Sequence, residues 1–245
     1  MHRFFAERID QNNARLLPQE ARHALTVLRL KAGENVQLIL EDQLFHAVLT
    51  QTGPDVLARL EAALPSPEPQ VRVTLYQGLP KADKVDWLVQ KCTEAGIYAV
   101  TVLEMVRSVS RMDTKDAVKK TERWQRIAQE AAKQSGRAHV PQIGVISEKK
   151  LPELLRAHDL VLVPWEEAHA VSLAQAVRAN RNARDIAVII GPEGGMTQEE
   201  VDAFHHAGAV PVTMGPRIFR TETAGLAALI MLLYEHGEYS TAEVD

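Results

Sequence analysis

The chain has 245 residues, of which 46% are hydrophobic and 24% charged, with a net charge of −4. This is the profile of an ordinary globular protein with one large domain or two unequal ones, and it excludes disordered and fibrous classes. The single cysteine, Cys92, excludes an intramolecular disulfide and fits a reducing compartment. No apolar run approaches the roughly 20 residues that span a bilayer, and no signal-peptide core follows Met1, so we expect a cytoplasmic protein.

The charges are distributed unevenly along the chain. Residues 71–150 hold 15 basic and nine acidic residues, whereas residues 151–245 hold six basic and 14 acidic residues. Much of the basic excess lies between Arg107 and Arg137. Clustered cations of this kind are typical of a surface that binds a phosphate backbone, although a solvated helix face produces the same pattern.

The first 65 residues predict short strands with one helical segment. A helix is expected to begin at Pro18, because proline suits the first helical turn. Alternating apolar residues predict paired strands at 36–40 and 44–50. Three prolines in the stretch Leu64–Pro69 then predict a stiff linker, which we place at a domain boundary after residue 68.

Strands and helices alternate from Val71 onward. The expected strands lie at 71–76, 100–106, 160–163, 185–190 and 210–214. The expected helices lie at 84–95, 114–135, 151–157, 171–179, 198–207 and 222–236. Asp83 is the expected cap of the first of these helices, and Thr197 with Glu200 forms a capping box for the fifth. This alternation predicts a mostly parallel sheet with helices on both faces.

Two glycine-bearing loops follow the last two predicted strands. They are Gly191–Gly195 and Met214–Ala224, and each precedes a predicted helix. In an open α/β sheet, ligands bind beyond the carboxyl ends of the strands, and glycines there expose backbone groups to a ligand. The sequence matches neither G-x-G-x-x-G nor the P-loop motif, which argues against dinucleotide and P-loop sites. A simple turn is the alternative for either loop alone.

Several segments in this order resemble the RsmE family of SPOUT-class RNA methyltransferases, over nearly the whole chain. The matching segments are Met1–Phe5, His23–Arg29 with Lys31 and Gly33, Lys81–Gly96, Trp124–Pro141, Gly191–Gly195 and Arg217–Ala224. The resemblance implies an α/β fold with a SPOUT-type knotted, mostly parallel sheet. Residues 1–68 would form a PUA-like RNA-binding β-barrel domain, and residues 69–245 a methyltransferase domain with a C-terminal trefoil knot.

The resemblance also implies an activity, a cofactor and partners. Members use S-adenosylmethionine to methylate N3 of a uridine in small-subunit (16S) ribosomal RNA, and they work as homodimers through the C-terminal helix. The cofactor would bind at the two glycine loops. The implied cofactor-binding residues are Leu162, Val163, Pro164, Gly191, Pro192, Glu193, Gly194, Met214, Gly215, Ile218, Arg220, Thr221, Thr223 and Ala224.

Methyl transfer to a ring nitrogen needs no covalent protein intermediate, so the absence of a paired nucleophile and base is no obstacle. Arg220 is the candidate for stabilising negative charge on the uracil carbonyls, with an ion pair to Glu222 as the alternative. Glu222 is the second catalytic candidate, either as a base or as a carboxylate that braces the loop. No metal is expected. The candidate phosphate contacts are Arg3, Arg22, Arg29, Lys84, Arg111, Lys115 and Arg137.

Three alternatives remain open from the sequence. The chain could be a SPOUT methyltransferase that acts on tRNA, or one that acts on a ribose hydroxyl. It could also be a non-catalytic RNA-binding or ribosome-assembly module on the same fold.

Overall fold

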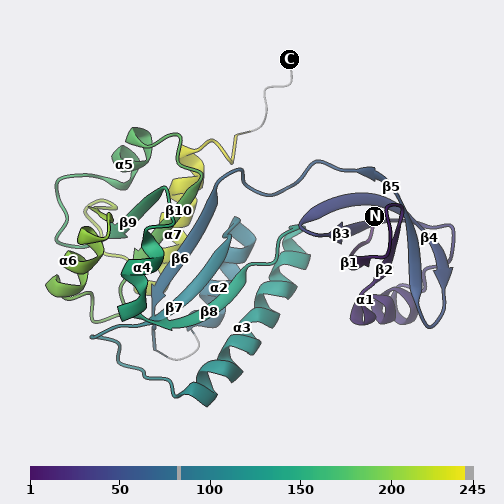
Figure 1. Ribbon diagram of the computed structural model, residues 1–245, viewed down its shortest axis with the longest axis horizontal. Helices are drawn as coiled ribbons and strands as arrows, with labels where there is room; N and C mark the ends of the chain where they lie inside the picture. The colour runs from purple at the N-terminus through teal and green to yellow at the C-terminus, as the bar shows by residue number, and fades with distance from the viewer. Residues whose placement is uncertain (82–83, 241–245) are drawn as a thin grey trace. The chain divides into compact units, whose positions relative to one another are not determined.

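The computed structural model describes residues 1–81 and 84–240 (Figure 1). The predicted helix cap Asp83 lies outside these residues. Contacts within the chain divide it into two units, each described here by itself. The first comprises Met1–Glu68 and Ala132–Val140, and the second comprises Pro69–Ala131 and the chain from Pro141 onward.

The first unit is a closed five-stranded barrel. Its strands are β1 (Arg3–Arg8), β2 (Asn13–Leu16), β3 (Asn35–Leu40), β4 (Gln43–Thr52) and β5 (Val56–Ala63), in the order β1-β2-β5-β4-β3. A parallel pairing of β1 with β3 closes the barrel, and the other pairings are antiparallel. Alternate residues such as Val36, Leu38 and Leu40 fill the core. The helix predicted at Pro18 is present as α1 (Pro18–Arg22), and it continues into a π-helical turn, η1 (His23–Val27).

Residues 132–140 belong to the barrel unit although 63 residues separate them from Glu68. Ala138 packs with Phe5, Ile39 and Leu44. The Glu68 carboxylate accepts hydrogen bonds from the Arg137 guanidinium and from the backbone N–H groups of residues 138 and 139. No periodicity in the sequence indicates this return, because the segment is short and its contacts are with residues remote in the sequence.

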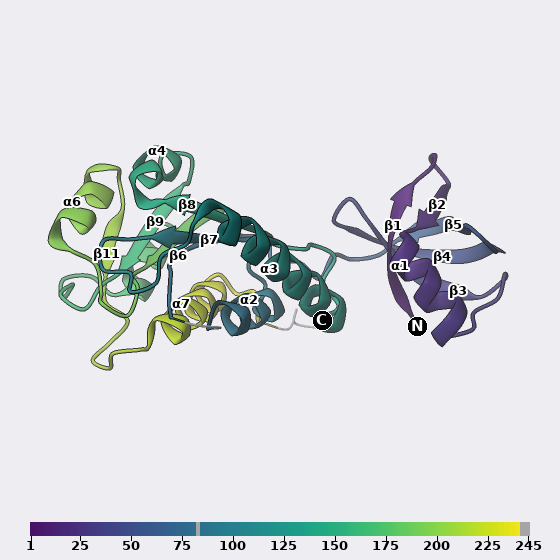
Figure 2. The same cartoon turned by 90° about the horizontal axis from the view of Figure 1, so that it is seen from below.

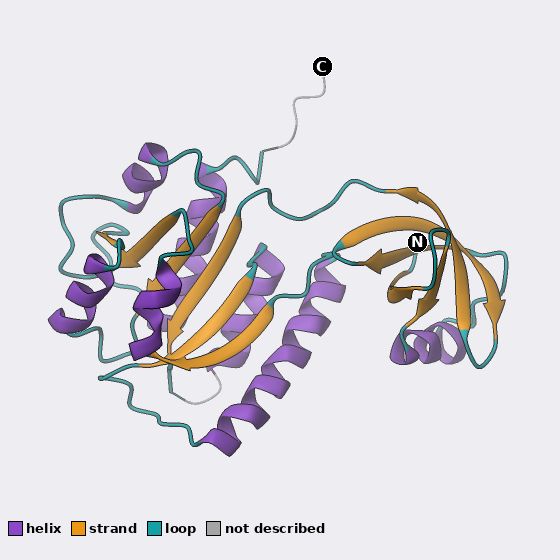
Figure 3. Ribbon diagram, viewed as in Figure 1, coloured by secondary structure: helices purple, strands orange, loops and turns teal. Residues whose placement is uncertain are grey.

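The second unit contains a six-stranded sheet in the order β11-β9-β10-β6-β7-β8 (Figure 3). Its strands are β6 (Arg72–Gly78), β7 (Ala99–Glu104), β8 (Gln142–Ser147), β9 (Leu160–Pro164), β10 (Asp185–Ile190) and β11 (Val210–Val212). Every strand pairing is parallel. The predicted parallel sheet is therefore confirmed, with β8 as an additional edge strand that the sequence pattern did not indicate.

Helices cover both faces of this sheet, as predicted (Figure 2). The helices are α2 (Lys84–Ala95), α3 (Thr114–Ser135), α4 (Leu151–Leu155), α5 (Leu173–Ala179), α6 (Gln198–His206) and α7 (Thr221–Glu235), with a 3₁₀ turn η2 (Glu148–Lys150). Figure 2 shows α2 and α7 on one face and α4 and α6 on the other. The Thr197–Glu200 capping box is present at the start of α6. None of the helices in the described part of the chain combines the length and apolar character needed to cross a membrane.

The parallel register brings the carboxyl ends of four strands to one edge of the sheet. Ile190, at the end of β10, lies opposite Gln77 of β6, and Val212 of β11 lies opposite Pro164 of β9. The loops that leave these strands therefore start close together, and both predicted glycine loops are among them.

Candidate functional site

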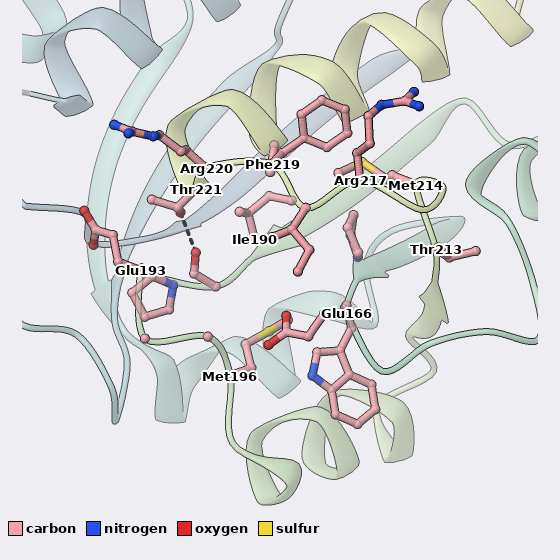
Figure 4. A pocket seen from close by; sticks show the side chains of 18 of the residues that line it. Glu166, Ile190, Glu193, Met196, Thr213, Met214, Arg217, Phe219, Arg220 and Thr221 are labelled. Carbon is pink, nitrogen blue, oxygen red and sulfur yellow. Dashed lines mark hydrogen bonds between the residues drawn. The ribbon is translucent and has the colours of Figure 1, made fainter.

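A cavity of about 910 Å³ lies at this edge of the sheet (Figure 4). Its walls come from the segments after β9, β10 and β11 and from the first residues of α7. The lining residues are Lys84, Pro164–Glu166, His169, Ile190–Met196, Thr213–Thr221 and Ala224. Figure 4 shows Glu193 and Arg220 toward one end of the cavity and Thr213 and Met214 toward the other.

Hydrogen bonds through Thr221 join the two glycine loops. The buried Thr221 hydroxyl donates to the Gly191 carbonyl oxygen at 2.5 Å and accepts from the Gln77 side-chain amide at 2.7 Å. Gln77 is itself fully buried at the end of β6, where its amide also donates to the Gly78 carbonyl oxygen. One hydroxyl therefore connects the ends of β6 and β10 with the start of α7.

We expect Thr221→Val to loosen this junction. Valine keeps the shape of threonine but leaves the buried Gln77 amide and Gly191 carbonyl short of a partner, which costs about 1–3 kcal/mol. Urea unfolding should show this loss, and calorimetry should show weaker binding of S-adenosylmethionine. Thr223→Val is the matched control, because Thr223 does not line the cavity. Equal effects of the two substitutions would contradict the role of the Thr221 hydroxyl.

The glycines of the first loop serve packing as well as backbone exposure. A side chain at Gly194 would meet the backbone oxygen and Cβ of Arg107 at 2.9 Å, so this position faces a neighbouring loop. The Arg107 guanidinium in turn donates to the Met196 carbonyl oxygen at 3.2 Å. Gly215, in the second loop, has a φ of +101° and open space where a Cβ would lie. There, glycine both permits the backbone conformation and leaves the main chain accessible.

A lysine between two glutamates forms the charged end of the cavity. The Lys84 ammonium lies 3.1 Å from Glu193 Oε1 and 3.3 Å from Glu222 Oε2. The hydrogen bond to Glu193 raises the pKa of Lys84 above its usual value, and Glu222 adds to this shift. Burial opposes ionisation of Glu193, but the Lys81 backbone N–H and the Lys84 ammonium lower the pKa of Glu193 overall. Lys84 and Glu193 are therefore both charged at neutral pH.

Arg220 precedes α7 and lines the cavity with an exposed side chain. Glu222 pairs with Lys84 and not with Arg220, which removes the alternative ion pair considered for this arginine. Within residues 1–81 and 84–240 the Arg220 guanidinium has no ion-pair partner. It is therefore available to a ligand.

The structure gathers most of the expected cofactor-binding residues around one cavity. Those that line it are Pro164, Gly191, Pro192, Glu193, Gly194, Met214, Gly215, Ile218, Arg220, Thr221 and Ala224. Leu162 and Val163 do not, because both are fully buried within the sheet. Thr223 and Glu222 also stand outside the lining, and Glu222 reaches the cavity only through Lys84.

The expected phosphate contacts differ in their availability. Arg22, Arg29, Arg111 and Lys115 are exposed on the surface. Arg3 donates to the Gln37 side chain and to the Gly136 carbonyl oxygen. Arg137 is only 5% exposed and pairs with Glu68. The guanidinium of Arg137 is therefore used in an ion pair within the barrel unit. Lys84 lines the cavity.

We expect Arg137→Met to destabilise the barrel unit, because Glu68 would be left partly buried without its guanidinium. Removing one partner of a buried ion pair costs about 3–5 kcal/mol. Urea unfolding followed by circular dichroism measures this cost. Arg22→Met, at an exposed site on α1, should change the unfolding free energy by less than about 0.5 kcal/mol. An unaltered midpoint for Arg137→Met would show that the ion pair is dispensable.

Sequence reasoning missed several residues of the site. Gln77 is the clearest case, and its signal was a polar residue at the end of an otherwise apolar strand, just before Gly78. Trp165, Glu166 and Met196 also line the cavity. Cys92, by contrast, is buried in α2, and burial raises the pKa of its thiol, so it is no nucleophile.

Residues 66–233 match the model of a family described as the RNA methyltransferase domain, and residues 16–58 match the RNA methyltransferase PUA domain. The chain is 33% identical to the ribosomal RNA small subunit methyltransferase E of Bacillus subtilis, over 96% of this chain and 97% of that protein. The chain belongs to this family. A Mycobacterium tuberculosis member is 36% identical over 86% of this chain and 82% of that protein.

Solved structures of the family share the fold. One is a ribosomal RNA small subunit methyltransferase E from Neisseria gonorrhoeae bound to S-adenosyl methionine, with 30% identity and a TM-score of 0.75. The superposition includes 94% of this chain and 95% of the Neisseria gonorrhoeae chain. A crystal structure described only as that of a hypothetical protein has 31% identity and a TM-score of 0.86, with 96% of this chain and 98% of that one covered.

Proposed function

We propose that this member of the ribosomal RNA small subunit methyltransferase E family uses S-adenosylmethionine to methylate N3 of a uridine in 16S ribosomal RNA. The observation that carries the proposal is the single cavity built by both glycine loops, with cationic side chains at one end. The reaction needs these two features: a site for the cofactor, and positive charge near the base that loses a proton.

The cavity fits S-adenosylmethionine in size and chemistry. Its volume lies within the roughly 300–1,000 Å³ range of small-molecule sites. Apolar side chains from Ile190, Met196 and Phe219 suit an adenine ring and a methyl group. The open main chain at Gly215 would supply hydrogen bonds to polar edges of the cofactor. When bound, the cofactor supplies an electrophilic methyl carbon, whose bond to sulfur breaks as the acceptor's electron pair attacks it.

The chain's own residues prepare the acceptor base. The uracil N3–H bond must break, with its proton passing to water at the open mouth of the cavity and its electron pair remaining on nitrogen. Negative charge then spreads onto the two flanking carbonyl oxygens. The unpaired Arg220 guanidinium would stabilise this charge, and positioning the base against the methyl carbon would supply roughly 7–11 kcal/mol of the barrier.

The two parts of the chain divide the work in this proposal. Residues 1–68 act as the PUA-like RNA-binding domain, with Arg22 and Arg29 among its phosphate contacts. Residues 69–245 form the catalytic domain, in which the chain around α7 passes through a trefoil knot. Arg111 and Lys115 bind phosphates there, and the target uridine enters the cavity unpaired or flipped. The protein works in the cytoplasm, where ribosomal subunits are assembled.

The test is nucleoside mass spectrometry of ribosomal RNA from cells that lack the protein. Loss of N3-methyluridine from 16S RNA, restored by the wild-type gene, is the expected result. Loss of a tRNA modification or of a ribose methyl group would show that the protein methylates a different substrate. Calorimetry with purified protein is the complementary measurement, since failure to bind S-adenosylmethionine would favour a non-catalytic RNA-binding module.

We further propose that the protein is a homodimer through α7. Ile230, Met231 and Tyr234 lie on one face of this helix and are 41%, 39% and 70% exposed. Their spacing of three and four residues forms a continuous apolar stripe, which a second copy of the chain would cover.

Replacing Met231 and Tyr234 together with glutamate should convert the dimer to a monomer in sedimentation equilibrium, because two charges cannot be desolvated in an apolar interface. Leu154→Glu is the control, since Leu154 is a similarly exposed apolar residue on α4. A double variant that remains dimeric would place the interface elsewhere.

A further inference from the structure

Lys84 is the charged group of α2 that enters the cavity. It is the first described residue of the helix and lies in the N-terminal part of it, where the positive end of the helix dipole disfavours a cation. Two carboxylates offset this, since Glu193 reaches it from the loop after β10 and Glu222 from the first turn of α7. Three separate elements thus converge to hold one ammonium group in place.

The geometry leaves part of this ammonium group for a ligand. A lysine ammonium has three N–H donors, of which Glu193 accepts one, while Glu222 is an ion-pair partner at 3.3 Å. Lys84 and Glu193 line the cavity. Glu222 pairs with Lys84 but does not line the cavity. Glu222 therefore acts on the cavity through Lys84, and within residues 1–81 and 84–240 the hydrogen bond to Glu193 leaves donor capacity of the ammonium for a ligand.

Arg220 occupies the same end of the cavity as Glu193, the partner of Lys84 (Figure 4). The acceptor edge of uracil has two carbonyl oxygens that flank the N3–H group. Two cationic donors that line one cavity match these two oxygens. Cytosine has an amino group in place of one carbonyl and would place a donor against a donor. The positive charges of Lys84 and Arg220 also suit a base that becomes anionic.

We propose that Lys84 is a catalytic residue that donates a hydrogen bond to one carbonyl oxygen of the acceptor uracil, while Arg220 serves the other. This inference rests on the proposed uridine methylation. Glu193 and Glu222 are positioning residues that fix the ammonium group. They also keep it protonated, as the raised pKa of Lys84 indicates. Lys84 thereby lowers the free energy of the N3 anion, and it is a base contact where the sequence suggested a phosphate contact.

The decisive variant is Lys84→Met in the full-length protein, assayed on small ribosomal subunits from cells that lack the enzyme. Turnover at neutral pH should fall about 10²-fold, the usual effect of losing one oxyanion donor, with cofactor affinity unchanged. Without the cation the N3 anion forms at higher pH. The rise of kcat with pH should therefore shift to higher pH in Lys84→Met, and the difference in turnover from the wild type should shrink at high pH. Lys91→Met is the matched control, because Lys91 lies on the same helix and pairs with Glu94.

A more acidic substrate distinguishes a catalytic role of Lys84 from a structural one. Subunits from cells grown with 5-fluorouracil carry a uracil whose N3–H ionises more readily, and they should recover most of the lost turnover of Lys84→Met. Lys84→Arg, which keeps the charge, should retain at least about a tenth of wild-type turnover.

Three results would overturn the assignment. A deficit of Lys84→Met that is the same at every pH and on both kinds of subunit would show a purely structural role. Loss of cofactor binding as the main defect would place Lys84 in the cofactor site. A Lys84→Arg variant as impaired as Lys84→Met would exclude a role for the charge. If the wild-type protein itself methylates no uridine, the proposed function fails first, and this inference fails with it.

Discussion

Replacing Arg220 with alanine should lower kcat by about 10²–10³-fold, or about 2.7–4 kcal/mol, and leave both fold and cofactor affinity intact. The guanidinium is exposed at the cavity and free of ion pairs within the described residues, so its removal disturbs no structural contact. The loss falls on the transition state, because negative charge on the uracil carbonyls develops only as the N3 proton leaves. Single-turnover methylation, with calorimetry for cofactor binding, measures the two effects separately.

Arg217 provides the control for this experiment. It lies three residues earlier in the same loop and also lines the cavity, but Figure 4 shows its side chain pointing away from that of Arg220. Arg217→Ala should therefore reduce turnover much less. Arg220→Lys should recover part of the rate, since it restores charge without the planar fork. Wild-type turnover in Arg220→Ala would remove this residue from the chemistry.

Adding a single methyl group at Gly78 should weaken cofactor binding strongly. A Cβ at this position would lie 2.5 Å from the Pro192 nitrogen and 2.8 Å from the Gly191 carbonyl carbon. These are backbone atoms and cannot swing aside, so Gly78→Ala must push the Gly191–Gly195 loop away from β6. We expect at least a tenfold loss of S-adenosylmethionine affinity, with a loss of stability of about 1–3 kcal/mol from overpacking.

Gly144→Ala tests whether glycine loss in this sheet is harmful in itself. Gly144 lies in β8, and its Cβ would meet only the Thr101 hydroxyl, at an ordinary 3.7 Å. This variant should bind cofactor normally. Normal binding by Gly78→Ala as well would mean that the loop can shift without effect on the site.

The parallel sheet was predictable because its central strands are continuous apolar runs between helical segments. β9 and β10 carry such runs, and Gly208 and the Thr197 capping box mark the ends of α6. β8 was not predictable in the same way. It follows Pro141, contains Gly144, and is only partly buried as an edge strand, so its apolar pattern is weak.

The site was predictable to the extent that it depends on loops after strands. Both glycine loops and Arg220 could be placed from sequence, because parallel strands bring their carboxyl ends to one edge. Leu162 and Val163 do not line the cavity, since a central strand is covered on both faces and the lining begins at Pro164. The bridge from Gln77 to Thr221 spans 144 residues, and the pairing of Lys84 with Glu222 is equally remote, so no local pattern reports them.

The return of residues 132–140 to the barrel sets an order on how the protein can be made. The nascent barrel lacks Ala138 and the partners of Glu68 until 72 residues beyond Glu68 have been translated. At about 5–20 residues per second, this delay lasts roughly 4–14 s. During that time the first strands of the parallel sheet also leave the ribosome. The N-terminal unit therefore cannot mature before residue 140 has been translated, and a fragment truncated at residue 68 should be poorly folded.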